Sequence, residues 1–74
     1  MPSLRQVRLA RLWSQQELAR RSGVAVRTIV YVENGERAPT LSTIRRLTEA
    51  LGVDWREVDE FRRTMEGLEE KVAD

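Results

Sequence analysis

The stretch QQELARRSGVAVRTIVYVEN, residues 15 to 34, predicts two helices joined by a tight turn. Ala19 is small enough to let the two helices cross closely, and Gly23 can turn the chain because glycine tolerates a left-handed backbone. Ile29 has the position that fills the angle between the helices, whereas Ser22 stands where a larger apolar residue is more usual. The other inward-facing residues expected here are Leu18, Val24 and Val32. The pattern favours two helices packed at an angle.

Helix start and stop signals lie on both sides of this pair. A Ser or Asp with Gln or Glu three residues later can form a capping box, in which side chain and backbone satisfy each other's hydrogen-bonding groups. Three pairs have this form: Ser3 with Gln6, Ser14 with Glu17, and Asp54 with Glu57. Thr40 is a further candidate N-cap. Helix ends are expected at Gly23, Gly35 and Gly52.

These signals predict an all-α fold. Helices are expected near residues 4–12, 15–22, 26–34, 41–51 and 55–66 or beyond. The third of them lacks a capping side chain, because neither Val24 nor Ala25 carries an oxygen that could accept from its first amides. No segment alternates with the period of a strand over any useful length. We therefore expect a compact bundle of five helices with short connections.

Length and composition exclude most enzymes. The chain has 74 residues, 41% of them apolar, which suits one small domain. Cys and His are absent, which removes disulfides, thiolate nucleophiles, the usual zinc ligands and the commonest general base. We expect no catalysis, no cofactor and no metal. No apolar run approaches the roughly 20 residues that span a bilayer, and a signal peptide is not evident, so we expect a soluble, cytoplasmic protein.

The net charge of +1 conceals two halves of opposite sign. Residues 1–46 carry nine arginines against three glutamates, a net charge of +6, and residues 47–74 carry four basic and nine acidic side chains, a net charge of −5. A basic half joined to an acidic half suggests one surface that attracts polyanions and another that repels them. On charge alone, two solvated helical faces would explain the pattern equally well.

The stretch from about Leu4 to Val58 resembles the lambda-repressor-like, or XRE-family, helix-turn-helix domain of phage and bacterial regulators. The matching segments are SQQELARRSGV, TIVYVENGERAPT and LSTIRRLTEALGVDW, in this order, together with Leu4, Val7 and Arg8. The resemblance implies a five-helix bundle whose second and third helices read DNA, commonly as a dimer on a palindromic operator.

Carried over position by position, the resemblance places the start of the third helix against base edges in the major groove. Arg27 is the main candidate for sequence reading, because its planar guanidinium can make a bidentate contact to guanine worth about 1–3 kcal/mol of discrimination. Ala25 and Val26 can offer only apolar contact, most usefully to a thymine methyl, while Tyr31 can donate a hydroxyl hydrogen bond or pack on the backbone. Alternatively, Val26, Val30 and Tyr31 are apolar because a protein or a neighbouring helix covers them.

The same resemblance implies phosphate contacts on both sides of that helix. The residues concerned are Gln15, Asn34, Arg37, Thr40 and Ser42. Such contacts position a domain on the duplex and set its salt dependence. For Thr40 and Ser42, a helix cap and a surface hydroxyl are equally good interpretations.

Four further charged residues are not assigned to base or phosphate contacts. The resemblance implies that Arg8 and Glu33 form a structural ion pair between the first and third helices. Arg20 and Arg21 either face the flank of the duplex or belong to a solvated helical face.

The C-terminal segment carries an apolar repeat. Its members, spaced 3, 4, 3 and 4 residues apart, are Val58, Phe61, Met65, Leu68 and Val72. This spacing is typical of a helix packed on a partner helix. We expect a DNA-binding domain over residues 1–60 and a helical extension over 61–74, with a dimer contact through Trp55, Val58, Phe61, Met65 and Leu68. The alternative is that Val58 and Phe61 close the domain's own core and the last ten residues fray.

The leading hypothesis is a sequence-specific, double-stranded DNA-binding transcriptional regulator of repressor type that acts as a homodimer. The second hypothesis is a protein-interaction module, such as an antitoxin or anti-regulator, that uses the same third helix on a protein partner.

Overall fold

The computed structural model describes residues 2–72, with side chains for residues 2–69. The helices are α1 (Leu4–Ala10), α2 (Gln15–Ser22), α3 (Val26–Glu33), α4 (Leu41–Leu51), the 3₁₀ helix η1 (Trp55–Glu57) and α5 (Asp59–Val72). Within residues 2–72 there is no strand, and the all-α fold class is confirmed.

Most helix starts follow the expected caps. The hydroxyl of Ser3 accepts from the Gln6 amide in a complete capping box at α1. Ser14 accepts from the Glu17 amide at α2, but the second bond of the predicted capping box is not formed, because the Glu17 carboxylate pairs with Arg20 and Arg21. Thr40 accepts from the Thr43 amide at α4. These bonds satisfy amides that would otherwise have no partner in the first turn of each helix. The sequence prediction of these three starts is therefore confirmed.

The predicted helix over residues 55–66 is wrong at its start. The capping box of Asp54 and Glu57 is present, but it opens η1, which has three residues. Val58 then takes an extended conformation, with φ −120° and ψ 121°, and its side chain is 0% exposed. The Asp59 amide donates to the carbonyl of Pro2 at 2.9 Å instead of continuing a helix. Burial of Val58 thus separates η1 from α5.

The first helix is shorter than predicted. It ends at Ala10, and Leu12 takes the left-handed conformation with φ 60°, which redirects the chain toward the start of α2. The side chain of Leu12 is 93% exposed. Its apolar character extends the helical pattern in the sequence, but it does not contribute to the core.

A single apolar core is formed by α1, α2, α3, α4 and the start of α5. Its buried apolar members are Leu4, Val7, Leu18, Val24, Ile29, Val32, Ile44, Leu47, Leu51, Val58 and Phe61. The inward positions predicted for α2, α3 and their connecting turn are all among them. Val58 and Phe61 are both 0% exposed. Within the single chain both side chains are therefore enclosed by the core, as the alternative of core closure expects, which leaves them no surface for a dimer contact in this fold.

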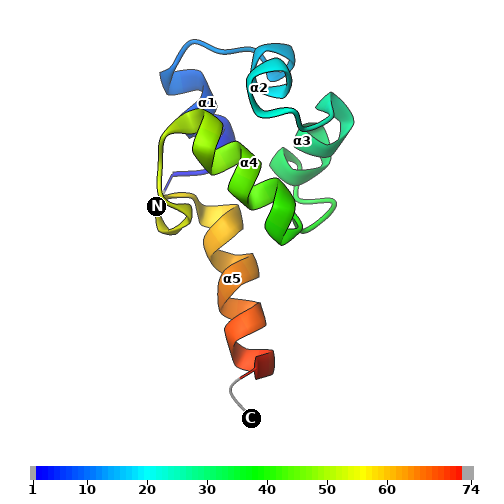
Figure 1. Cartoon of the computed structure of the whole chain (residues 1–74), viewed down its shortest axis with the longest axis vertical. Helices are drawn as coiled ribbons and strands as arrows, with labels where there is room; N and C mark the ends of the chain where they lie inside the picture. Colours follow the sequence, from blue (N-terminus) through cyan, green and yellow to red (C-terminus); the bar gives the residue numbers. More distant parts are fainter. Residues whose placement is uncertain (1, 73–74) are drawn as a thin grey trace.

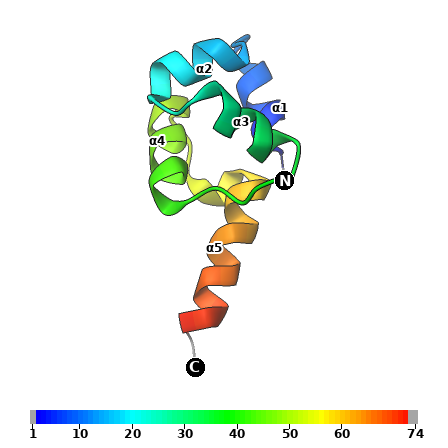
Figure 2. The same cartoon turned by 90° about the vertical axis from the view of Figure 1, so that its right-hand side faces the viewer.

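Helix α5 starts in the core and then extends away from the body of the molecule (Figures 1 and 2). The molecule consequently measures 41 × 21 × 20 Å along its principal axes. Met65 is half-buried and packs against the core, and Leu68, nearly one turn further along, is also half-buried. The projecting part of α5 has little of its own chain to pack on.

Candidate nucleic-acid interface

The turn between α2 and α3 is built by two local contacts. Gly23 has φ 76°, and its amide donates to the carbonyl of Ala19 at 2.9 Å. The hydroxyl of Ser22 accepts from the Val24 amide at 3.1 Å. This bond explains why a serine stands where an apolar residue is more usual. Ala25 precedes α3 and makes no side-chain cap, as expected.

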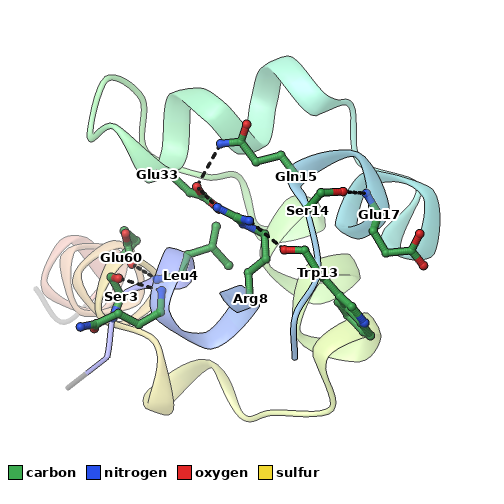
Figure 3. Close-up of polar contacts among 10 residues, drawn as sticks. Ser3, Leu4, Arg8, Trp13, Ser14, Gln15, Glu17, Glu33 and Glu60 are labelled. Carbon is green, nitrogen blue, oxygen red and sulfur yellow. Dashed lines mark hydrogen bonds and ion pairs between the residues drawn. The ribbon is translucent and has the colours of Figure 1, made fainter. Parts of the chain in front are cut away.

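A buried ion pair fixes α1 against the end of α3. The Nε of Arg8 donates to Glu33 Oε2 at 2.7 Å, and Nη2 donates to Glu33 Oε1 at 3.0 Å (Figure 3). The side chains are only 7% and 3% exposed. Nη1 of Arg8 also donates to the carbonyl of Trp13 at 2.8 Å, so the same guanidinium holds the segment that enters α2. The predicted pairing of Arg8 with Glu33 is confirmed.

Gln15, the first residue of α2, is attached to this pair. Its Nε2 donates to Glu33 Oε1 at 3.1 Å (Figure 3). Gln15 lines a polar surface hollow together with Asn34, the second predicted phosphate contact on this side of α3. The full lining of the hollow is Arg5, Arg8, Ser14, Gln15, Gln16, Glu33 and Asn34. Arg5 is exposed and was not singled out from the sequence. The signal in the sequence that could have indicated Arg5 is its spacing of three residues from Arg8, which places both side chains on the same face of one helix.

A second hollow lies between α3 and the start of α4. Its lining is Arg27, Thr28, Tyr31, Val32, Arg37, Ala38, Pro39, Thr40 and Thr43. The main base-reading candidate, Arg27, therefore shares one hollow with two predicted phosphate contacts, Arg37 and Thr40. Ser42 is exposed on the first turn of α4, and its neighbour Thr43 lines the hollow instead.

The start of α3 is open to solvent. Ala25 and Arg27 are exposed, and Val26 and Tyr31 are half-buried. Because the first amides of α3 have no side-chain cap, they and the positive end of the helix dipole are available to an external anion or base edge. The arrangement can receive a polyanion whose backbone lies on both sides of this helix.

Arg20 and Arg21 are held by a carboxylate on their own helix. Arg20 pairs with Glu17, as does Arg21, and the Arg21 guanidinium also lies 4.4 Å from the centre of the Trp13 ring. Hydrogen bonds from the two guanidinium groups hold the pKa of the Glu17 carboxyl below its usual range, and the bond from Arg20 has the larger effect. Because Glu17 pairs with both guanidinium groups on their own helix, the solvated helical face is the better of the two interpretations of Arg20 and Arg21.

The fold and this surface define a helix-turn-helix protein. The chain belongs to the lambda-repressor-like helix-turn-helix family, because a family profile described as Helix-turn-helix matches residues 4–58. This is a family of DNA-binding transcription regulators. No curated protein and no solved structure matches the chain significantly. Among the helices described over residues 2–72, none has the length and apolar character needed to cross a membrane.

Proposed function

We propose that the protein is a sequence-specific regulator of repressor type that binds double-stranded DNA as a homodimer in the cytoplasm. The observation that carries this proposal is the convergence of Arg27 and Arg37 on one hollow beside the exposed start of α3. Gln15 and Asn34 line a second hollow, on the side where α2 begins. Two phosphate-binding flanks around one reading helix are what a major-groove reader requires.

Arg27 carries sequence reading in this proposal. It is exposed on the first turn of α3, where a guanidinium can reach the O6 and N7 of guanine. Ala25 and Val26 lie beside it and supply apolar contact to a thymine methyl. Phosphate contacts are assigned to Gln15, Asn34, Arg37, Thr40 and Ser42, and the exposed Arg5 joins them because it lines the same hollow as Gln15.

The dimer contact is assigned to Trp55, Met65 and Leu68. All three are half-buried, and the last two lie on the helix that projects from the body. Arginines and carboxylates on α5 pair within the helix, Arg63 with Asp59 at 2.7 Å and Arg62 with Glu66 at 3.3 Å. Each pair is neutral as a unit, so these four side chains add little repulsion between two copies of α5. A two-fold dimer is expected to present its two α3 helices roughly 34 Å apart.

Selection from random duplexes tests the whole proposal. The purified chain is mixed with the pool at two salt concentrations, retained duplexes are sequenced, and the complex is weighed by native mass spectrometry. We expect a two-fold symmetric site whose half-sites are centred about 10 base pairs apart, with two chains per duplex. Weak, unselective retention that disappears at the higher salt would show only non-specific attraction and would contradict the proposal.

The variant Arg27→Ala tests the reading residue. Loss of a bidentate guanine contact is expected to reduce discrimination at one base pair of each half-site by about 5- to 150-fold, equivalent to about 1–3 kcal/mol. Thermal stability should remain close to the parent because the side chain is exposed. Arg20→Ala is the matched control, since it removes the same charge from α2 and should leave base preference unchanged. An unchanged preference in Arg27→Ala would show that another residue reads the site.

A second candidate function is a protein-interaction module, such as an antitoxin or anti-regulator. Half-buried Val26 and Val30 on α3 favour it, because both offer apolar surface to a protein partner. Failure of the duplex selection would favour this candidate.

A further inference from the structure

The loop after α3 is folded back onto the last turn of that helix. The carbonyl of Tyr31 accepts from the amide of Glu36 at 2.9 Å and from that of Arg37 at 3.4 Å. Gly35 makes the reversal possible with φ 73°, and its amide donates to the carbonyl of Val32 at 3.1 Å. The backbone of Arg37 is thereby attached to Tyr31. Pro39, which is buried, stiffens the far end of the loop.

The side chains of these two residues are also in contact. The Cζ of Arg37 lies 4.7 Å from the centre of the Tyr31 ring, within the range of a cation–π interaction. Tyr31 is half-buried, so its ring is a more fixed support than the exposed arginine it carries. The stack restricts a long side chain that would otherwise sample many rotamers.

Arg37 differs from the other two arginines that stack on aromatic rings because it has no carboxylate partner among the described side chains. Arg21 lies over Trp13 but also pairs with Glu17, and Arg56 lies over Trp55 but also pairs with Asp54 at 3.4 Å. Arg37 belongs to none of the ion pairs found among the described side chains. Its guanidinium is therefore held in place while its charge and its donors remain available to an anion.

We propose that Tyr31 is a positioning residue whose ring holds Arg37 for a DNA phosphate, and that its hydroxyl does not read a base. The inference rests on the proposed function and extends it. Because Arg37 and Arg27 line the same hollow, the fixed guanidinium sets the distance between the phosphate contact and the base contact. Preorganisation of this kind raises affinity by lowering the entropy lost on binding.

Binding isotherms on the selected operator and on an unrelated duplex test the inference. Tyr31→Phe keeps the ring and should match the parent in affinity and base preference. Tyr31→Leu keeps apolar volume without a π face, and it should weaken binding to both duplexes by about two- to fivefold. Arg37→Ala should weaken both and reduce the slope of log K against log salt by about one unit. Adding Tyr31→Leu to Arg37→Ala should cause no further loss.

Two results would overturn the inference. A changed base preference in Tyr31→Phe would show that the hydroxyl reads a base, and additive losses in the double variant would show that the ring does not act through Arg37. Thermal melts of every variant separate loss of fold from loss of contact. If the parent chain binds no duplex selectively, the proposed function fails and this inference fails with it; if the parent binds and only these variants depart from expectation, the proposed function stands.

Discussion

Replacing Glu33 by alanine is expected to destabilise the domain by about 3–5 kcal/mol, because it leaves the guanidinium of Arg8 buried without a counter-charge. The Arg8 side chain is 7% exposed, so little of its guanidinium is hydrated in the folded domain. A domain of this size has a total free energy of unfolding of about 4–11 kcal/mol. The substitution therefore removes a large part of the total stability, and only if the parent lies at the low end of this range does it leave much of the protein unfolded.

Urea unfolding followed by circular dichroism measures this loss. Glu36→Ala is the matched control, since Glu36 is exposed in the loop after α3 and its removal should change stability by less than about 0.5 kcal/mol. The double variant Arg8→Met with Glu33→Leu should recover part of the loss, because no uncompensated charge remains. Recovery is incomplete because the carbonyl of Trp13 loses its donor. An unfolding midpoint for Glu33→Ala equal to that of the parent would show that Arg8 is solvated without its partner.

The ion pair also connects stability to the interface. Glu33 Oε1 accepts from both Arg8 and Gln15, so the carboxylate that balances a buried charge also orients the first side chain of α2. A conservative change such as Glu33→Gln is expected to disturb this orientation even where the fold persists. The predicted phosphate contact at Gln15 thus depends on a residue that touches no DNA in the proposed complex.

The parts of the fold that could be predicted from the sequence are those with local causes. The N-caps accept hydrogen bonds from amides in the first turn of their own helices; they are Ser3, Ser14 and Thr40. Gly23 ends α2 through its own left-handed backbone conformation. Each of these features can therefore be predicted without knowledge of the tertiary structure. The resemblance to a known family supplied the pairing of Arg8 with Glu33, which are 25 residues apart.

The missed features depend on contacts between distant segments. The break at Val58 arises because its side chain enters a core built by other helices, and because the Asp59 amide finds the carbonyl of Pro2. The stack of Arg37 on Tyr31 depends on the exact return of the loop over α3. Apolar spacing at Val58 and Phe61 is the same for a core and for a dimer contact, so periodicity alone could not separate them.

Phe61→Ala gives the second large expected effect, a loss of about 3–5 kcal/mol of stability. Phe61 is 0% exposed and is the largest fully buried side chain among the described residues, although it lies on the helix assigned to dimerisation. Deleting its ring should leave a cavity between α5 and the body, because neighbouring side chains relax only partially. Met65→Ala is the control on the same helix, since Met65 is half-buried and should cost less stability.

The dependence of these two losses on protein concentration separates core packing from dimerisation. Loss of a core contact lowers the stability of each protomer, so the cost of Phe61→Ala should be the same at all concentrations. Loss of a dimer contact weakens association, so the cost of Met65→Ala should have a constant part from its packing on the core and a part that grows with protein concentration and appears as a larger fraction of monomer in sedimentation. A concentration-dependent loss for Phe61→Ala would place its ring in the dimer contact. With the expected result, α5 has two separate roles: its first turn completes the core, and its projecting part remains available to a second copy.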